Sequence, residues 1–362
     1  MSSENKNEIE MPDIGKISPA IFTELIFPRL GAANKNILVG PQHGVDVGIA
    51  QIGNKAVSFT TDPVFIVPEY GWERAAWFAL HIIASDSVTS GLKPTYLSID
   101  LNLPMQMTKG QLSIVWQVIH QECERMGIAV ITGHTARYEN CDFPMVGGAT
   151  MLGVGELDEY VSPKFIKPGD KIIITKGPAI EASGIFATMF PHVIEKQFGK
   201  AFSKKAAGIF SLMSVVEDAL IAISVGVRDN GISALHDATE CGIWGGLYEI
   251  AQAAGLGVLV EKEKIVVTDG VLEICDYMGI DPYASISEGT LLATCRPHKA
   301  DVVVQALAKR KIKASVVGEL TDTKKGMVLI EKGKKKKLVH PIVDPFWRAF
   351  YGALEKNSAR KT

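Results

Sequence analysis

Hydrophobic and polar positions follow two different periods along this chain, which predicts a mixture of strands and helices. In residues 95–103, apolar residues (Leu or Ile) occupy every second position and alternate with Tyr, Ser, Asp and Asn, so that one face is apolar. This period of two predicts a strand that is buried on one side. Residues 72–90 are instead rich in Ala, Ile and Phe, and Gly91 and Pro94 follow them. That order predicts a long helix and its end.

The same reasoning covers the remainder of the chain. In the first half we expect strands over residues 56–62, 95–103, 128–132 and 145–155, and helices over residues 19–30, 72–90 and 109–126. In the second half we expect strands over residues 170–175 and 290–296, helices over residues 177–189, 206–224, 247–254 and 345–356, and a hairpin over residues 324–340. Strand 56–62 should end at Asp-Pro, and strand 128–132 should be buried and end at Gly133.

A polar segment with two prolines, residues 157–168, predicts a domain boundary. We therefore divide the chain into a leader (1–14), an N-terminal domain (15–157), a C-terminal domain (168–320), and a hairpin with a terminal helix (321–362). Both domains mix strands and helices, so the expected class is α+β, with an α/β arrangement in the C-terminal domain.

Composition limits the classes of function. With 362 residues and 47% hydrophobic residues, the chain can bury more than one core. Its 38 basic and 40 acidic side chains nearly cancel, which argues against nucleic acid as a partner. No apolar run reaches the roughly 18 residues of a membrane span. The polar start is unlike a secretory signal, and five scattered cysteines without a CxxC pair predict no disulfide framework or zinc site. We expect a cytoplasmic protein without a membrane partner.

Three aspartates of the first half are candidates for metal binding. Asp46 lies in a glycine-flanked loop, Asp62 ends an apolar strand, and Asp86 interrupts an apolar helix. If they converge, their carboxylates suit Mg²⁺, which prefers oxygen ligands and shares them with phosphates. A turn role for Asp62 before Pro63, and a solvent-facing position for Asp86, are the competing interpretations.

Three polar loops are further candidates. Gly133-His134-Thr135 follows a predicted strand and suits a phosphate, although a plain turn explains it equally well. Asp237, in the stretch 236–242 before a helix, belongs either to an oxyanion or phosphate site or to a helix cap. Glu288 lies in a loop that lines a cleft or forms a simple turn. For Cys241 we favour packing over catalysis. The chain carries no P-loop, no GxGxxG after a strand and no GxSxG.

Taken together and in order, these pieces resemble the PurM-like superfamily of ATP-using enzymes, which includes AIR synthase, selenophosphate synthetase, thiamine-monophosphate kinase and HypE. The similarity is greatest to HypE and its archaeal AIR-synthase-like relatives. Seven stretches carry it, namely residues 44–50, 60–64, 84–97, 131–135, 169–184, 235–247 and 280–289.

The resemblance implies an ATP-binding N-terminal domain, a C-terminal α/β domain, and a homodimer whose N-terminal strands share a barrel. It also implies ATP and Mg²⁺ as cofactors. Asp46, Asp62 and Asp86 would hold the metal. The other implied nucleotide contacts are Lys16, Gly133, His134 and Thr135. Asp237 and Glu288 are our candidates for catalytic residues on the acceptor side.

Departures from the family pattern leave three functions open. Val45 stands where a second acid is usual, His134 stands where kinase and maturation relatives place an acid, and no cysteine follows Cys295. The first hypothesis is an ATP- and Mg²⁺-dependent enzyme that activates an amide-type oxygen of a small or carbamoyl acceptor. The second is a kinase similar to thiamine-monophosphate kinase. The third is a non-catalytic nucleotide-binding maturation partner or scaffold that has lost turnover.

Overall fold

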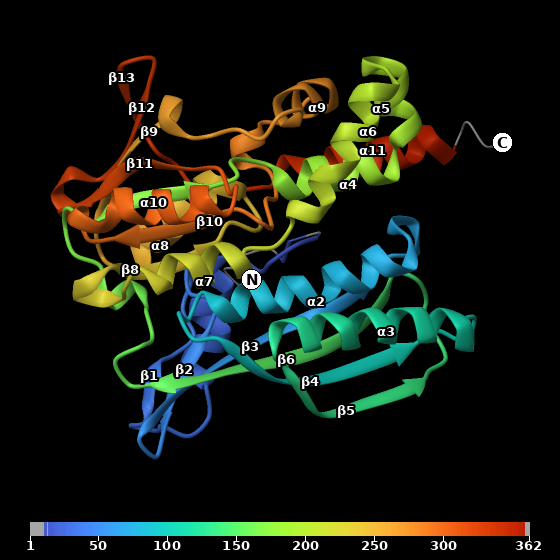
Figure 1. The fold of residues 1–362 in the computed structure, drawn as a ribbon, viewed down its shortest axis with the longest axis horizontal. Coiled ribbons are helices and arrows are strands. Elements are labelled where there is room, and N and C mark those ends of the chain that lie inside the picture. The colour runs from blue at the N-terminus through green and yellow to red at the C-terminus, as the bar shows by residue number, and fades with distance from the viewer. Residues whose placement is uncertain (1–10, 13, 359–362) are drawn as a thin grey trace, which may run out of the picture.

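Two mixed β-sheets, each accompanied by helices, make up the computed structural model, which describes residues 11–12 and 14–358 (Figure 1). The predicted leader lies largely outside these residues. The first sheet has the strand order β1-β2-β3-β6-β4-β5, and only β4 and β5 run parallel. Its strands are β1 (Ile37–Val39), β2 (Gly48–Ile52), β3 (Lys55–Ile66), β4 (Pro94–Leu103), β5 (Ala129–Arg137) and β6 (Met145–Glu156).

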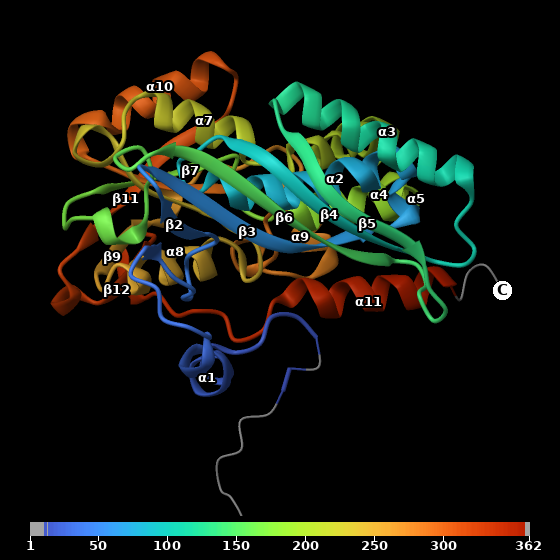
Figure 2. The same cartoon turned by 90° about the horizontal axis from the view of Figure 1, so that it is seen from below.

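Two long helices, α2 (Trp72–Val88) and α3 (Lys109–Met126), cover one face of this sheet. Figure 2 looks onto the other face, where β3, β4, β5 and β6 run in front of α2 and α3. Helix α3 has the predicted bounds because both ends are encoded locally. Thr108 and Gln111 form a capping box at its start, and Gly127 takes the left-handed conformation at its end.

Strand β3 shows that the predicted end at Asp-Pro was wrong. The strand continues through Asp62 and Pro63 to Ile66. Strand β2 pairs with β3 only as far as Phe59, so beyond that residue β3 has a neighbour on one side alone. Because no second ladder is present at Pro63, its missing N–H costs no hydrogen bond there.

The prediction for residues 128–132 was also wrong in two respects. Strand β5 runs on through Gly133 to Arg137, and it lies at the edge of the sheet with most of its residues exposed. Its apolar residues suggested a buried strand, but burial depends on the neighbours of a strand as well as on its own composition. The tripeptide Gly133-His134-Thr135 is therefore part of a strand and does not follow one.

The second sheet has the order β13-β12-β9-β11-β7-β10-β8, with β9 and β12 as its parallel pair. Its strands are β7 (Lys171–Thr175), β8 (Ile232–Asp237), β9 (Gly257–Glu261), β10 (Leu291–Cys295), β11 (Ala314–Thr321), β12 (Met327–Glu331) and β13 (Lys334–Lys337). The helices of this half are α4 (Ile180–Met189), α5 (Pro191–Phe198), α6 (Lys200–Ala206), α7 (Val216–Ser224), α8 (Gly242–Ala253), α9 (Val271–Met278), α10 (Ala300–Lys309) and α11 (Pro345–Ser358). The lysine-rich hairpin and the terminal helix are confirmed.

Three helices differ from prediction. Helix α8 begins at Gly242 and not at Leu247, so that Gly245 and Gly246 lie within it. The single helix expected over residues 206–224 is a 3-10 segment, Ala207–Leu212, followed by α7. The break brings the backbone N–H of Val215 to the hydroxyl of Ser85, so a tertiary hydrogen bond replaces a helical one. Residues 19–30 are helical only in short pieces, with α1 (Pro19–Ile21) continuing into π and 3-10 turns up to Arg29.

One hydrophobic cluster joins the two sheets. It contains Ile83 of α2, Ala219 of α7 and Leu291 of β10, and all three are fully or almost fully buried. The last turn of α2 is thereby held against the second half of the molecule. Asp86 lies on that turn, so this packing brings it to the junction of the two sheets.

Among the described residues, no single helix has the length and apolar character needed to cross a membrane. One bent pair, Lys200–Leu212 with Val216–Ser224, satisfies the criteria of length and composition when taken together.

Candidate functional site

The three predicted aspartates lie at the junction of the two sheets. Asp46 precedes β2, Asp62 lies within β3, and Asp86 is on the last turn of α2. The carboxyl groups of Asp62 and Asp86 are within hydrogen-bonding reach of each other. Burial raises the pKa of Asp86 well above its usual value, and the charges of Asp62 and Asp46 raise it further. The three carboxyl groups therefore repel one another, as expected of a site that takes up positive charge.

Two acids of the second half join this cluster. The backbone N–H of Asp237, at the end of β8, donates to Oδ2 of Asp46 over 3.3 Å. Burial raises the pKa of Asp237 to about 7, although its contact with Glu288 opposes that rise. Burial and the neighbouring Asp237 together place the pKa of Glu288 well above its usual value. The predicted acceptor-side pair thus lies beside the predicted metal ligands.

Several oxygens of this cluster have no hydrogen-bond donor within the described part of the chain. They are Oδ2 of Asp62, both carboxylate oxygens of Asp237, and Oε1 of Glu288. A buried carboxylate without a partner is costly, so such oxygens fit a cation or a protonated ligand group. In the same described residues, no three His, Cys, Asp or Glu side chains are close enough to hold a metal ion by themselves. A cation here would need further oxygens, and phosphate is the usual donor for Mg²⁺.

A chain of charged residues that was not predicted extends from Asp46 toward the C-terminal segment. His236 lies 3.0 Å from Asp46 through Nδ1 and 3.0 Å from Glu249 through Nε2. Glu249 also lies 3.2 Å from Nε2 of His340. Burial lowers the pKa of His236, but the two carboxylates outweigh it and raise the pKa to about 10. His236 is therefore a cation that holds Asp46 in place.

Lys16 reaches the same region from the N-terminal segment. Its ammonium group donates to the hydroxyl of Thr239 over 3.2 Å, and its backbone N–H donates to Glu240 over 3.1 Å. Desolvation lowers the pKa of Lys16, but Asp86, Glu249, Asp46 and Glu240 more than offset it, and the pKa is raised. As a residue Lys16 is exposed, while its ammonium group lies among carboxylates, a position suited to an anionic ligand.

The tripeptide in β5 lies apart from the acids. Register runs from Asp62 through Ala149 and Ile99 to Gly133, so three strand steps separate the tripeptide from Asp62. Side chains alternate between the faces of a sheet, which places His134 on the face opposite Asp62. On that face, Nε2 of His134 lies 2.9 Å from the hydroxyl of Tyr138. The nucleotide role of these three residues stays a prediction.

Cys241 is buried, in agreement with a packing role. It has a left-handed backbone with φ of 64°, and its N–H donates to Asp344 over 2.7 Å. Burial raises the pKa of the thiol to about 12, so at neutral pH it is not a thiolate nucleophile.

Glu181, at the start of α4, gives a testable pH dependence. Burial raises its pKa from 4.5 to about 8, and its carboxylate accepts the backbone N–H of Glu288 over 3.1 Å. Between these two values the folded chain keeps a proton that the unfolded chain has released, so stability falls as pH rises. We expect Glu181→Gln to reduce the fall in thermal midpoint between pH 5 and pH 8.5. Thermal unfolding at both pH values measures this, with exposed Glu195→Gln as the control. An unchanged fall in the Glu181 variant would contradict the assignment.

Comparison with known proteins adds two family matches. Residues 44–155 match the family model described as AIR synthase related protein, N-terminal domain. Residues 167–331 match the model described as AIR synthase related protein, C-terminal domain. Neither match covers residues 156–166, and all of these except residue 156 belong to the segment 157–168.

Among curated relatives, a protein of Methanocaldococcus jannaschii named for hydrogenase expression and formation is 25% identical over 339 residues, covering 92% of this chain and 96% of the relative. The carbamoyl dehydratase HypE of Bradyrhizobium diazoefficiens is 28% identical over 233 residues, which is 63% of each chain.

Solved structures with a similar fold include members of two enzyme groups. HypE from a HypE–HypF complex superposes with a TM-score of 0.67 at 22% identity, covering 81% of this chain and 93% of that chain. The structure of HypE in complex with ATP superposes with a TM-score of 0.64 at 21% identity, covering 92% of this chain and 97% of that chain. The structure of AaThiL complexed with AMPPCP and TMP superposes with a TM-score of 0.64 at 18% identity, covering 85% of this chain and 91% of that chain. These likenesses agree with the two-domain fold expected from sequence.

Proposed function

The chain belongs to the AIR synthase related family of the PurM-like superfamily, and from this premise we propose that it is an ATP- and Mg²⁺-dependent enzyme of the HypE type. In this proposal, the terminal phosphoryl group of ATP passes to an amide-type oxygen of a small or carbamoyl acceptor. The observation that carries it is the acid cluster at the junction of the two sheets, with oxygens that lack a donor among the described residues. The relatives named carbamoyl dehydratase and the ATP complex of HypE support it.

Each group of residues has a distinct role in the proposal. Asp46, Asp62 and Asp86 would hold Mg²⁺ together with phosphate oxygens, and the ion would supply neutralisation of phosphate charge. His236 fixes the orientation of Asp46 through its 3.0 Å contact. Lys16, whose ammonium group lies among the acids, is placed to attract the phosphates. Catalysis would then depend mainly on positioning and on charge.

Asp237 and Glu288 are the proposed acceptor-side residues. Their carboxyl groups are buried and in contact, so one of the pair can keep a proton while the other is ionised. Such a pair can donate a hydrogen bond to the acceptor oxygen and receive a proton from the acceptor nitrogen. An amide oxygen leaves poorly as it stands, and it leaves more readily after it has been phosphorylated.

An assay of ADP release tests the proposed function. We expect release to require both Mg²⁺ and an acceptor from a panel of carboxamides and carbamoyl compounds, and to stop when EDTA removes the metal. No acceptor-dependent ADP release across the panel, despite nucleotide binding by calorimetry, would favour the non-catalytic alternative, in which the chain binds nucleotide as a maturation partner but has lost turnover.

A kinase is the second candidate, because the AaThiL structure in complex with AMPPCP and TMP has a similar fold. Mass spectrometry of the product separates the two candidates. A kinase product gains a phosphoryl group and keeps it, whereas activation of an amide oxygen ends with loss of that oxygen as phosphate.

The proposal also includes partners. We propose a homodimer formed through the outer face of the first sheet, the face that Figure 2 shows. Phe65, Tyr96 and Val146, on β3, β4 and β6, are 39 to 47% exposed. The HypE–HypF complex supports a maturation partner protein for this chain as well. We place the protein in the cytoplasm, in keeping with five free cysteines in the described residues.

A further inference from the structure

The terminal helix α11 builds a cleft that the proposed function does not use. The cleft has a volume of about 710 Å³ and lies between α11, the end of α9 and the turn from α4 to α5. Figure 1 shows α11 beside α4, α5 and α6 on the side of the molecule opposite the β12–β13 hairpin. Its walls include Phe190, Val193, Tyr277, Ile280, Ala349 and Ala353. Both family matches end before α11 begins, so this helix is outside the matched segments.

Packing fixes the walls of the cleft. Phe346 of α11 is buried and its ring lies 5.2 Å from that of Phe186, while Phe350 lies 6.2 Å from Phe190. At the start of the helix, the carboxylate of Asp344 accepts the backbone N–H groups of Phe346 and Cys241 over 2.9 and 2.7 Å. The helix is therefore anchored along one side and at one end, which is what a preformed ligand pocket needs.

Positive charge lines the side of α11 that faces the cleft. Arg348, Gly352 and Lys356 all line it and follow one another at intervals of four, so they share one stripe of the helix. Neither Arg348 nor Lys356 has an ion pair or side-chain hydrogen bond to any other described residue. A Cβ atom added to Gly352 would have no heavy atom within 4 Å, so there is open space beside the middle of this stripe. The cleft thus combines apolar walls with two cations that have no partner within residues 14–358.

Apolar surface continues outside the cleft. Val343 lines its edge and is 74% exposed, and the adjoining Ile342 is 97% exposed. Exposed large apolar side chains next to an apolar pocket indicate a ligand with an extended apolar part. Asp344 is the acid among the lining residues, and it is buried just before the start of α11, where it disfavours an anion. An anionic group would therefore lie toward Arg348 and Lys356.

From these observations we propose that the cleft binds a small amphipathic anion, with its apolar chain against Phe190 and Val193 and its carboxylate or phosphate between Arg348 and Lys356. The volume lies within the range of about 300–1,000 Å³ that is typical of small-molecule sites, which favours a small molecule over a protein segment. The proposal is independent of the acid cluster and of the reaction proposed there.

Calorimetric titration of the full chain with sodium decanoate, below its micellar concentration and at low salt, tests the proposal. We expect saturable binding at one site. Gly352→Leu should abolish it, because the added side chain fills this open space, while leucine in place of glycine stabilises a helix by about 1 kcal/mol and so preserves the fold. The double variant Arg348→Gln, Lys356→Gln should weaken binding about tenfold.

The control is Tyr351→Leu, which places leucine at an exposed position of the same helix without a change of charge and should bind decanoate as the original chain does. Decyltrimethylammonium, with the same alkyl chain and a positive head group, should bind at least about tenfold more weakly. Absence of decanoate binding, unchanged binding by Gly352→Leu, or equal affinity for the cationic probe would each overturn the proposal.

Discussion

Replacing Asp86 by asparagine is expected to lower the Mg²⁺-dependent rate by about 10²- to 10³-fold, and at the same time to raise the thermal midpoint of the ligand-free protein. The loss follows from the proposed role, because asparagine has the size of aspartate but cannot contribute negative charge to a metal. The gain follows from the contact between Asp86 and Asp62. At a pH where Asp86 is ionised, its carboxylate repels that of Asp62, whereas an amide in its place donates a hydrogen bond to Asp62.

Opposite changes in activity and stability distinguish a metal site from a structural role. If Asp86 served only the fold, its substitution would lower both the rate and the midpoint. Steady-state ADP release at several Mg²⁺ concentrations and thermal unfolding without Mg²⁺ measure the two quantities. Glu73→Gln on the same helix is the matched control, since Glu73 is exposed in the first turn of α2. If Asp86→Asn or Asp62→Asn kept the original Mg²⁺-dependent rate, the assignment of Mg²⁺ to this cluster would be wrong.

Asp62 and Asp86 could be singled out from sequence because each is out of place locally. Asp62 stands in an apolar strand and Asp86 in an apolar helix, where a buried charge is costly unless it binds a partner. The bounds of α3 could also be predicted, because its capping residues are adjacent in the chain. Features whose cause is local were therefore accessible without coordinates.

Features that depend on distant segments were not accessible. His236 and Glu249 are 13 residues apart, but Asp46 and His340, which complete their chain of contacts, come from opposite ends of the molecule. Nothing in the residues around His340 signals that contact. The prediction that strand β5 is buried was wrong for the same reason, since its edge position is decided by the order of the other strands. The relative placement of His134 and Asp62 follows from register, which a single sequence does not reveal.

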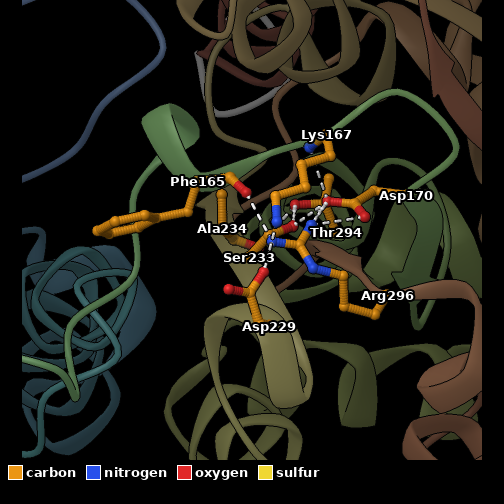
Figure 3. A network of polar contacts seen from close by, with 8 residues as sticks. All are labelled: Phe165, Lys167, Asp170, Asp229, Ser233, Ala234, Thr294 and Arg296. Atoms are coloured by element: carbon orange, nitrogen blue, oxygen red, sulfur yellow. Dashed lines mark hydrogen bonds and ion pairs between the residues drawn. The ribbon is translucent and has the colours of Figure 1, made fainter.

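A second large effect is expected at the buried ion pair between Asp170, which precedes β7, and Arg296, which follows β10; Figure 3 shows it in detail. Arg296 donates to Oδ1 of Asp170 over 2.7 Å, and the two side chains are only 9% and 2% exposed. Asp170 also accepts from the hydroxyl of Ser233 and the backbone N–H of Lys167. The other end of the guanidinium donates to the carbonyl of Phe165 over 3.0 Å. The pair thus ties the segment that precedes β7 to the end of β10.

Arg296→Met should lower the free energy of unfolding by about 3–5 kcal/mol, because it leaves the carboxylate of Asp170 buried without its cation. Adding Asp170→Leu should restore much of the loss, since the double variant buries no unpaired charge. Urea unfolding of the two variants measures both steps, and Arg310→Met is the control. Arg310 pairs with Glu217 over 3.0 Å at the surface, where both side chains are more than half exposed, so its loss should cost less than about 1 kcal/mol. Equal losses of unfolding free energy in Arg296→Met and Arg310→Met would show that burial does not govern the strength of this pair. A double variant that is less stable than Arg296→Met would show that Asp170 stabilises the fold through its hydrogen bonds to Ser233 and Lys167 alone.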